Sequence, residues 1–104
     1  MEFTTFKMIS DEDMDFITEF IETFESVSLP QVKKMLSDFT EGNLDGLKKE
    51  AHQLKPTAEL LEMATHATIV KINLNPEQTT TEELEAVISD AELTLSELKR
   101  VFSS

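Results

Sequence analysis

The sequence predicts an all-α fold, an antiparallel four-helix bundle with up-down-up-down connectivity. Apolar residues recur with a period near 3.6 along most of the 104-residue chain, and no segment shows the alternation typical of a strand. Only two glycines and three prolines interrupt this pattern, so long segments with short connections are expected. With 39% hydrophobic residues at this length, we expect a single domain that spans residues 1–104.

The first of the four helices is expected to begin at Ser10 and to end near Ser26. Ser10 is a favoured N-cap residue, and residues 11–13 put three carboxylates on the first turn, where the helix dipole stabilises negative charge. The apolar segment at residues 3–9 is expected to form either a short extra helix or an arm packed on the bundle. The first helix then presents one apolar stripe, made of Phe16, Ile17, Phe20, Ile21 and Phe24.

Two further helices follow. Pro30 suits the first position of the second helix, because proline has no N–H to lose there and its φ is already helical. Gly42 is expected to stop this helix, and Asn43 to cap a third helix that runs from Leu44 into the low sixties. The third helix has a buried stripe that consists of Leu47, Ala51, Leu54, Ala58 and Leu61.

The last third of the chain is expected to be helical with one break. Residues 64–74 are rich in β-branched side chains, which lowers helix propensity, but two isoleucines there can face a bundle. Residues 75–80 form a linker, and Thr80 or Thr81 caps the final helix. That helix has an apolar stripe made of Leu84, Val87, Ile88, Ala91, Leu95, Leu98 and Val101.

Charge and composition exclude several classes of function. Nine basic residues face 21 acidic ones, a formal net charge of −12, so the chain lacks the basic surface that nucleic acids and anionic membranes require. No apolar run reaches the roughly 20 residues that span a bilayer, and residues 1–15 lack a signal-peptide core. The absence of cysteine excludes disulfides and thiol chemistry. We expect a cytoplasmic protein, and a monomer, because the apolar stripes are sufficient for one bundle.

His52 stands apart from the buried stripe of the third helix. At about 100° per residue it lies roughly 100° or more from that stripe, toward solvent, with Lys48 one turn before it and Lys55 three residues after it. A neutral imidazole nitrogen is a nucleophile, and the two lysines would attract a dianionic phosphoryl group. On geometry alone, a histidine on an ordinary solvated helix face stays open as an interpretation.

The residues around this histidine carry a motif. Positions 50–57 read Glu-Ala-His-Gln-Leu-Lys-Pro-Thr, which resembles the Ala-His-x-Leu-Lys-Gly-Ser signature of histidine phosphotransfer domains, the intermediates of multistep phosphorelays. The likeness extends weakly over the whole chain in length, acidity and helix order. The outright matches are Ala51, His52, Leu54 and Lys55, and Thr57 keeps the hydroxyl of the family's serine.

The resemblance implies a phosphoryl carrier rather than an enzyme with a complete active site. His52 would accept a phosphoryl group from a receiver-domain aspartate and pass it to another, Lys55 would help to neutralise that group, and Thr57 would orient the ring. The chain would hold no metal or other cofactor, because in this family the receiver supplies the acidic pocket and the magnesium ion. Its partners would be receiver domains of response regulators or hybrid histidine kinases. They would dock around Lys48, Pro56, Glu59 and Met63.

Three residues depart from the family pattern. Pro56 replaces the usual glycine and removes the helical hydrogen bond to the carbonyl of His52, with an expected bend. Glu59, seven residues after His52, shares its face at roughly 10 Å along the axis and would repel phosphate. Glu62 stands where the family commonly has glycine. The alternative function is therefore a degenerate bundle that docks a receiver or another protein without phosphoryl transfer.

Other sites have weaker support in the sequence. His66, the second histidine, is expected to have a structural or solvated role. Glu62 and His66 are four residues apart, but no second Glu-x-x-His pair accompanies them, so we expect no metal site. No glycine-rich loop, catalytic carboxylate pair or Ser-His-Asp pattern favours a self-contained hydrolase. The donor kinase, the acceptor regulator and the pathway stay open.

Overall fold

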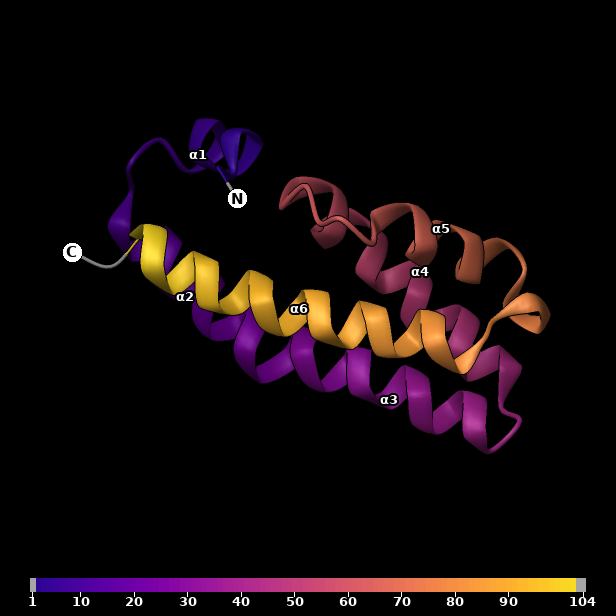
Figure 1. Ribbon diagram of the computed structural model, residues 1–104. Coiled ribbons are helices and arrows are strands. Elements are labelled where there is room, and N and C mark those ends of the chain that lie inside the picture. The colour runs from indigo at the N-terminus through magenta and orange to yellow at the C-terminus, as the bar shows by residue number, and fades with distance from the viewer. Residues whose placement is uncertain (1, 103–104) are drawn as a thin grey trace.

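The computed structural model describes residues 2–102, and within that range it contains helices and no strand, which confirms the all-α prediction. The helices form an elongated body of 42 × 20 × 19 Å (Figure 1). The six α-helices are α1 (Thr4–Ser10), α2 (Met14–Thr23), α3 (Leu29–Thr40), α4 (Leu44–Leu60), α5 (His66–Leu74) and α6 (Thr81–Phe102). A π-helical turn, η1, occupies Phe24–Ser28, and a 3-10 turn, η2, occupies Pro76–Gln78.

The beginning of the chain differs from its prediction. Ser10 is the last residue of α1 and is buried, with its hydroxyl donating to the Lys7 carbonyl at 3.3 Å, so its prediction as the N-cap of the first main helix is wrong. Asp11 and Glu12 then adopt left-handed backbone conformations that turn the chain. Asp13 caps α2 by accepting from the Phe16 N–H at 3.1 Å. The acidic run therefore supplies the cap as well as the first-turn charge.

The expected break before Pro30 is absent. α2, η1 and α3 follow one another without a loop, and Pro30 lies in the first turn of α3 (Figure 1). Proline cannot donate to the carbonyl four residues earlier, and its ring clashes with that carbonyl. The π turn immediately before it widens the helix, with the Leu29 N–H bonded to the Phe24 carbonyl, so the chain passes through the proline instead of ending.

The boundary between α3 and α4 and the start of α6 agree with the sequence. Gly42 has a left-handed φ of 78° and ends the turn after α3, while Asn43 caps α4 by accepting from the Gly46 N–H at 3.0 Å. At the start of α6, Thr80 accepts from the Glu83 N–H at 3.2 Å and the Glu83 carboxylate accepts from the Thr80 N–H at 3.0 Å. This reciprocal pair is a capping box, and it identifies Thr80 as the cap.

The helices pack around one apolar core. α4 lies against α3 on one side and α5 on the other, and α6 closes the core against α3 and the end of α5. Figure 1 shows that successive helices from α3 to α6 run in opposite directions. Side chains from each of them are almost fully buried, among them Met35, Leu47, Ala51, Ile69, Ile72, Leu84, Val87 and Leu98.

An aromatic cluster holds α1 on the end of the body where α2 begins and α6 ends. Phe6 is fully buried, with its ring centroid 4.6 Å from that of Phe20 and 5.4 Å, edge-on, from that of Phe102. Phe3 is also buried and packs on Phe102 at 6.1 Å. The segment predicted as a short helix or an arm is therefore a helix that belongs to the core.

Candidate functional site

His52 lies in the middle of α4 and is exposed, as the helical geometry predicts. Its neighbours Ala51 and Leu54 are buried, so they hold this part of α4 firmly on the core. Within residues 2–102 no hydrogen bond or ion pair involves the imidazole ring, so the ring can be reached from solvent. A fixed helix with an accessible imidazole is the geometry that a docking phosphoryl donor requires.

Lysines surround this histidine along α4. Lys48 and Lys49, one turn before His52, are exposed, while Lys55 is half-buried. Residues 48–56, one turn to either side of His52, carry three lysines and one buried carboxylate, and Glu59 follows two turns from His52, although the chain as a whole has nine basic and 21 acidic residues. The surroundings of His52 are therefore locally basic in an acidic protein, which favours an approaching phosphoryl group or an acidic partner.

The neighbouring helix α5 contributes a residue that the sequence did not single out. Asn73 is buried, and its Oδ1 accepts a hydrogen bond from Lys55 Nζ at 3.0 Å. Its Nδ2 donates to the backbone carbonyl of Lys48 at 3.2 Å. The side chain of Asn73 thus connects two points of α4 that bracket His52. No sequence signal could have identified it, because the contact depends on how α5 packs on α4.

Pro56 and Thr57 follow His52 on the same helix. α4 continues through the exposed Pro56 to Leu60, and the missing N–H leaves the His52 carbonyl without its usual helical donor. Thr57 lies five residues after His52, about 140° around the helix. Among the described residues no hydrogen bond joins its hydroxyl to the ring, so the structure does not bring Thr57 into the expected ring-orienting position.

The chain reverses after Leu60, which changes the environment of two residues predicted near the site. Glu62 has a left-handed φ of 55°, a conformation that favours glycine, and its carboxylate accepts from the Thr5 N–H at 2.9 Å. That backbone hydrogen bond lowers the pKa of Glu62. Met63 is buried, with only 6% of its surface exposed, so its prediction as a docking residue is wrong. The error came from continuing the helical angle beyond the end of α4.

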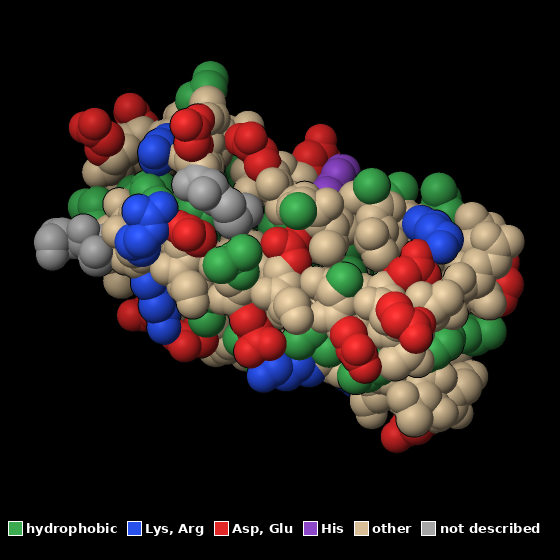
Figure 2. All heavy atoms as spheres, viewed as in Figure 1, with side chains coloured by type: hydrophobic (Ala, Val, Ile, Leu, Met, Phe, Trp, Pro, Cys, Tyr) green, Lys and Arg blue, Asp and Glu red, His purple; other side chains and the backbone are tan. Residues whose placement is uncertain are grey.

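Glu59 keeps the position that the sequence predicts. It is exposed on α4, seven residues from His52 and on the same face. It therefore places a negative charge roughly 10 Å along the axis from the histidine. Figure 2 shows acidic side chains spread over the visible face of the molecule, with few basic ones among them.

A buried polar cluster connects α3 to α4 on another side of the histidine helix. Lys34 Nζ lies 3.2 Å from Asp38 Oδ2 and 3.1 Å from Glu50 Oε1. Both carboxyl groups are buried, and they lie within hydrogen-bonding reach of each other. Gly46 lies beside them, and a Cβ there would come within 2.8 Å of Asp38 Oδ2 and 2.5 Å of Asn43 Nδ2, so both side chains would have to shift. This cluster fixes the register of α4 against α3.

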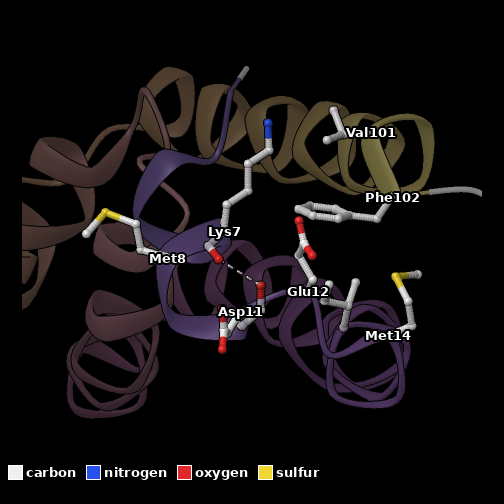
Figure 3. A pocket seen from close by; sticks show the side chains of 9 residues that line it. Lys7, Met8, Asp11, Glu12, Met14, Val101 and Phe102 are labelled. Atoms are coloured by element: carbon white, nitrogen blue, oxygen red, sulfur yellow. Dashed lines mark hydrogen bonds between the residues drawn. The ribbon is translucent and has the colours of Figure 1, made fainter.

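A shallow cleft of about 720 Å³ opens at the other end of the body, between α1, the start of α2 and the end of α6 (Figure 3). Figure 3 shows Phe102 and Met14 on one side of it and Met8 on the other, with Lys7 and Glu12 between them. Its polar lining consists of Lys7, Ser10, Asp11 and Glu12, and neither histidine lies in it.

Neither a metal site nor a membrane helix is found in the described part of the chain. No group of three or more histidine, aspartate or glutamate side chains within residues 2–102 is arranged to hold an ion. Over the same range no helix is both long and apolar enough to cross a membrane. His66 is half-buried at the start of α5.

Comparisons with known proteins supply no relative. No family model matches the chain, and neither a search of curated proteins nor a search of solved structures finds a match.

Proposed function

We propose that this chain is a histidine phosphotransfer protein, which relays a phosphoryl group between receiver-domain aspartates through His52. One observation carries the proposal most directly: the single motif histidine is exposed at the centre of a helix otherwise anchored in the core, with Lys48, Lys49 and Lys55 around it. Positioning and charge neutralisation are the main requirements of phosphoryl transfer. A rigid, basic helix face with one nucleophile can supply both.

The transfer step uses only the imidazole of this chain as a covalent participant. A lone pair on a neutral ring nitrogen of His52 attacks the phosphorus of the receiver's aspartyl phosphate, and the N–P bond forms as the O–P bond breaks. The electron pair of the broken bond leaves with the aspartate carboxylate, and the other ring nitrogen keeps its proton. Magnesium belongs to the receiver and neutralises the phosphoryl oxygens from that side. The return step reverses these changes.

The scaffold of the proposal is an antiparallel four-helix bundle formed by α3, α4, α5 and α6, with up-down-up-down connectivity. The alternating directions of these helices and their mutual contacts support this arrangement. In the proposed setting the chain acts as a monomer in the cytoplasm, as a signalling intermediate of a multistep two-component phosphorelay. It needs no cofactor of its own.

The proposed docking surface for receivers surrounds His52 on α4. Lys48 and Pro56, each one turn from the histidine, are exposed and accessible to a partner. Glu59 lies at the far edge of the surface and would disfavour an acidic receiver.

Transfer from a phosphorylated receiver tests the proposal. The chain is incubated with a phosphorylated receiver domain and magnesium, and acid-labile, base-stable phosphate is measured by intact mass. We expect one phosphoryl group on the wild type and none on the His52→Gln variant. The matched control is His66→Gln, which removes the other histidine and should keep full labelling.

The second candidate function is docking of a receiver or another protein without transfer, and exposed Glu59 on the His52 face favours it. If neither the wild type nor His66→Gln gains phosphate while both bind a receiver, this candidate is correct. In that case Glu59→Ala is the first change expected to restore labelling.

A further inference from the structure

We propose that Asn73 is a positioning residue that holds the Lys55 ammonium beside His52 without neutralising it. The inference rests on the proposed function, because its purpose is to keep a free positive charge for the phosphoryl group. It assigns a role in the site to a residue of α5, a helix that carries no part of the motif.

The two hydrogen bonds of Asn73 define how it holds the site. The residue is 7% exposed, and both ends of its amide are used: Oδ1 accepts from Lys55 Nζ at 3.0 Å and Nδ2 donates to the Lys48 carbonyl at 3.2 Å. In an α-helix the carbonyl of Lys48 also accepts from the backbone N–H of His52. The buried amide of Asn73 therefore joins α5 to two points of α4: the turn that ends at His52, and Lys55, which lies about one turn further on.

Lys55 differs from the other lysines that side-chain contacts hold in place, because its partner carries no charge. Lys55 contacts a neutral amide, and no ion pair joins it to a carboxylate within residues 2–102. Elsewhere, carboxylates pair with the ammonium groups of Lys34, Lys71 and Lys99. A lysine side chain is flexible, so a fixed ammonium needs a partner, and a carboxylate partner would cancel much of its charge. Asparagine at position 73 fixes the ammonium and leaves the charge available.

Asn73→Asp changes the two hydrogen bonds of this side chain in different ways. The aspartate keeps the acceptor for Lys55 and adds an ion pair, but it loses the N–H that donates to the Lys48 carbonyl. The positive charge beside His52 would be largely neutralised, however, and phosphoryl transfer would become slower. Asn73→Ala removes the tie and should also slow transfer, because Lys55 is then no longer held.

A small-molecule phosphoryl donor tests this without any contribution from receiver docking. With phosphoramidate, a lone pair of His52 forms the N–P bond while the P–N bond of the donor breaks, and its electron pair leaves with ammonia, which solvent protonates. The rate of labelling is measured by intact mass for the wild type, Asn73→Asp and Lys55→Met. The matched control is Asn75→Asp, which adds the same charge two residues away, where no contact with Lys55 is present among the described residues.

We expect Asn73→Asp and Lys55→Met each to label about three- to tenfold more slowly than the wild type. When Asn73→Ala is combined with Lys55→Met, the rate should fall no further than in Lys55→Met alone, because Asn73 acts through the Lys55 ammonium. Asn75→Asp should stay within about twofold of the wild type. Thermal unfolding of Asn73→Asp is measured in parallel, to separate slower chemistry from loss of the fold.

The outcomes distinguish the two proposals. Labelling of folded Asn73→Asp at the wild-type rate, or an equal further loss in the double variant, would overturn the role of Asn73 and leave the function of His52 intact. A wild type that gains no more phosphate than His52→Gln from phosphoramidate and from receivers would overturn the proposed function, and the role of Asn73 with it.

Discussion

Two buried carboxyl groups, Asp38 on α3 and Glu50 on α4, lie within hydrogen-bonding reach of each other. Burial, followed by the neighbouring Asp38, raises the pKa of Glu50. The hydrogen bond from Glu50, aided by Lys34 and Asn43, lowers the pKa of Asp38. When the pair holds one proton, the proton therefore lies on Glu50 and the charge on Asp38. We predict opposite results for the substitutions Glu50→Gln and Asp38→Asn.

The sizes of these effects follow from the hydrogen bonds. Ionised Glu50 leaves its buried Oε2 without a hydrogen-bond donor among residues 2–102, and an unsatisfied buried acceptor costs about 1–3 kcal/mol. The amide of Glu50→Gln can donate to Asp38 at any pH, so this variant should gain about 1 kcal/mol over the wild type at about pH 8. Asp38→Asn loses a buried charged acceptor and should cost about 2 kcal/mol. The exposed Lys34 contributes little, because solvent screens it.

The pH dependence has a defined sign for each residue. The pKa of Glu50 is higher in the folded state than its value of 4.5 in the unfolded state. Glu50 therefore contributes fully to stability at a pH below 4.5, and this contribution is lost as the pH rises through the folded-state pKa. The advantage of Glu50→Gln should therefore be absent in acid and appear toward neutral pH. The pKa of Asp38 is lowered, so its contribution is present above its unfolded value of 3.8 and is lost as the pH falls through the folded value. The penalty of Asp38→Asn should shrink only below pH 3.8, where Asp38 itself becomes protonated.

Thermal unfolding followed by circular dichroism, at about pH 4 and about pH 8, measures both variants. In a domain of this size about 1 kcal/mol moves Tm by roughly 4–8 °C, so the expected effects are measurable. A Glu50→Gln variant less stable than the wild type at the higher pH would refute the raised pKa of Glu50. An Asp38→Asn variant with unchanged Tm at about pH 4 would refute the assignment of the charge to Asp38.

Three further predictions concern the aromatic cluster, the α4–α5 turn and the docking surface. Phe6→Ala should lower the free energy of unfolding by about 3 kcal/mol, measured by urea denaturation, because the side chain is fully buried; a loss under about 1 kcal/mol would mean that α1 contributes little to the core. Asp90→Asn should lower the free energy of unfolding by about 1–2 kcal/mol in the same assay, because the Asp90 carboxylate accepts from the Thr65 N–H at 2.9 Å and from the Thr65 hydroxyl at 2.6 Å. Adding Thr65→Val to Asp90→Asn should cost little more if the two residues act through one contact. Glu59→Ala should speed phosphoryl transfer from an acidic receiver about twofold at low salt, with no gain at high salt; a gain that persists in high salt would contradict an electrostatic cause.

Local signals predicted much of the histidine helix and its position. The cap at Asn43, the stop at Gly42 and the apolar stripe that ends at Leu61 are properties of consecutive residues, and the exposure of His52 follows from their helical angles. The same approach failed for Met63, because α4 ends at Leu60 and the angle of about 100° per residue does not apply beyond the end of a helix.

Features that depend on tertiary contacts were not predictable from the sequence. Ser10 has the chemistry of an N-cap, but burial of the phenylalanines of α1 against α6 extends that helix to Ser10 and moves the cap to Asp13. The contact between Asn73 and Lys55 joins two helices and has no local signature. The contact between Asp38 and Glu50 also joins two helices, and nothing in the sequence distinguishes these two residues from surface carboxylates.

The central claim is that His52 carries a phosphoryl group from one aspartate to another, and transit of a radiolabelled group tests it most directly. A receiver labelled with 32P is mixed with the chain, the labelled chain is isolated, and it is then offered to a second, unlabelled receiver. We expect the label to appear on the chain, to be absent from His52→Gln, and to leave the chain as the second receiver becomes labelled. Label that never reaches the chain, or that reaches His52→Gln equally well, would contradict the claim.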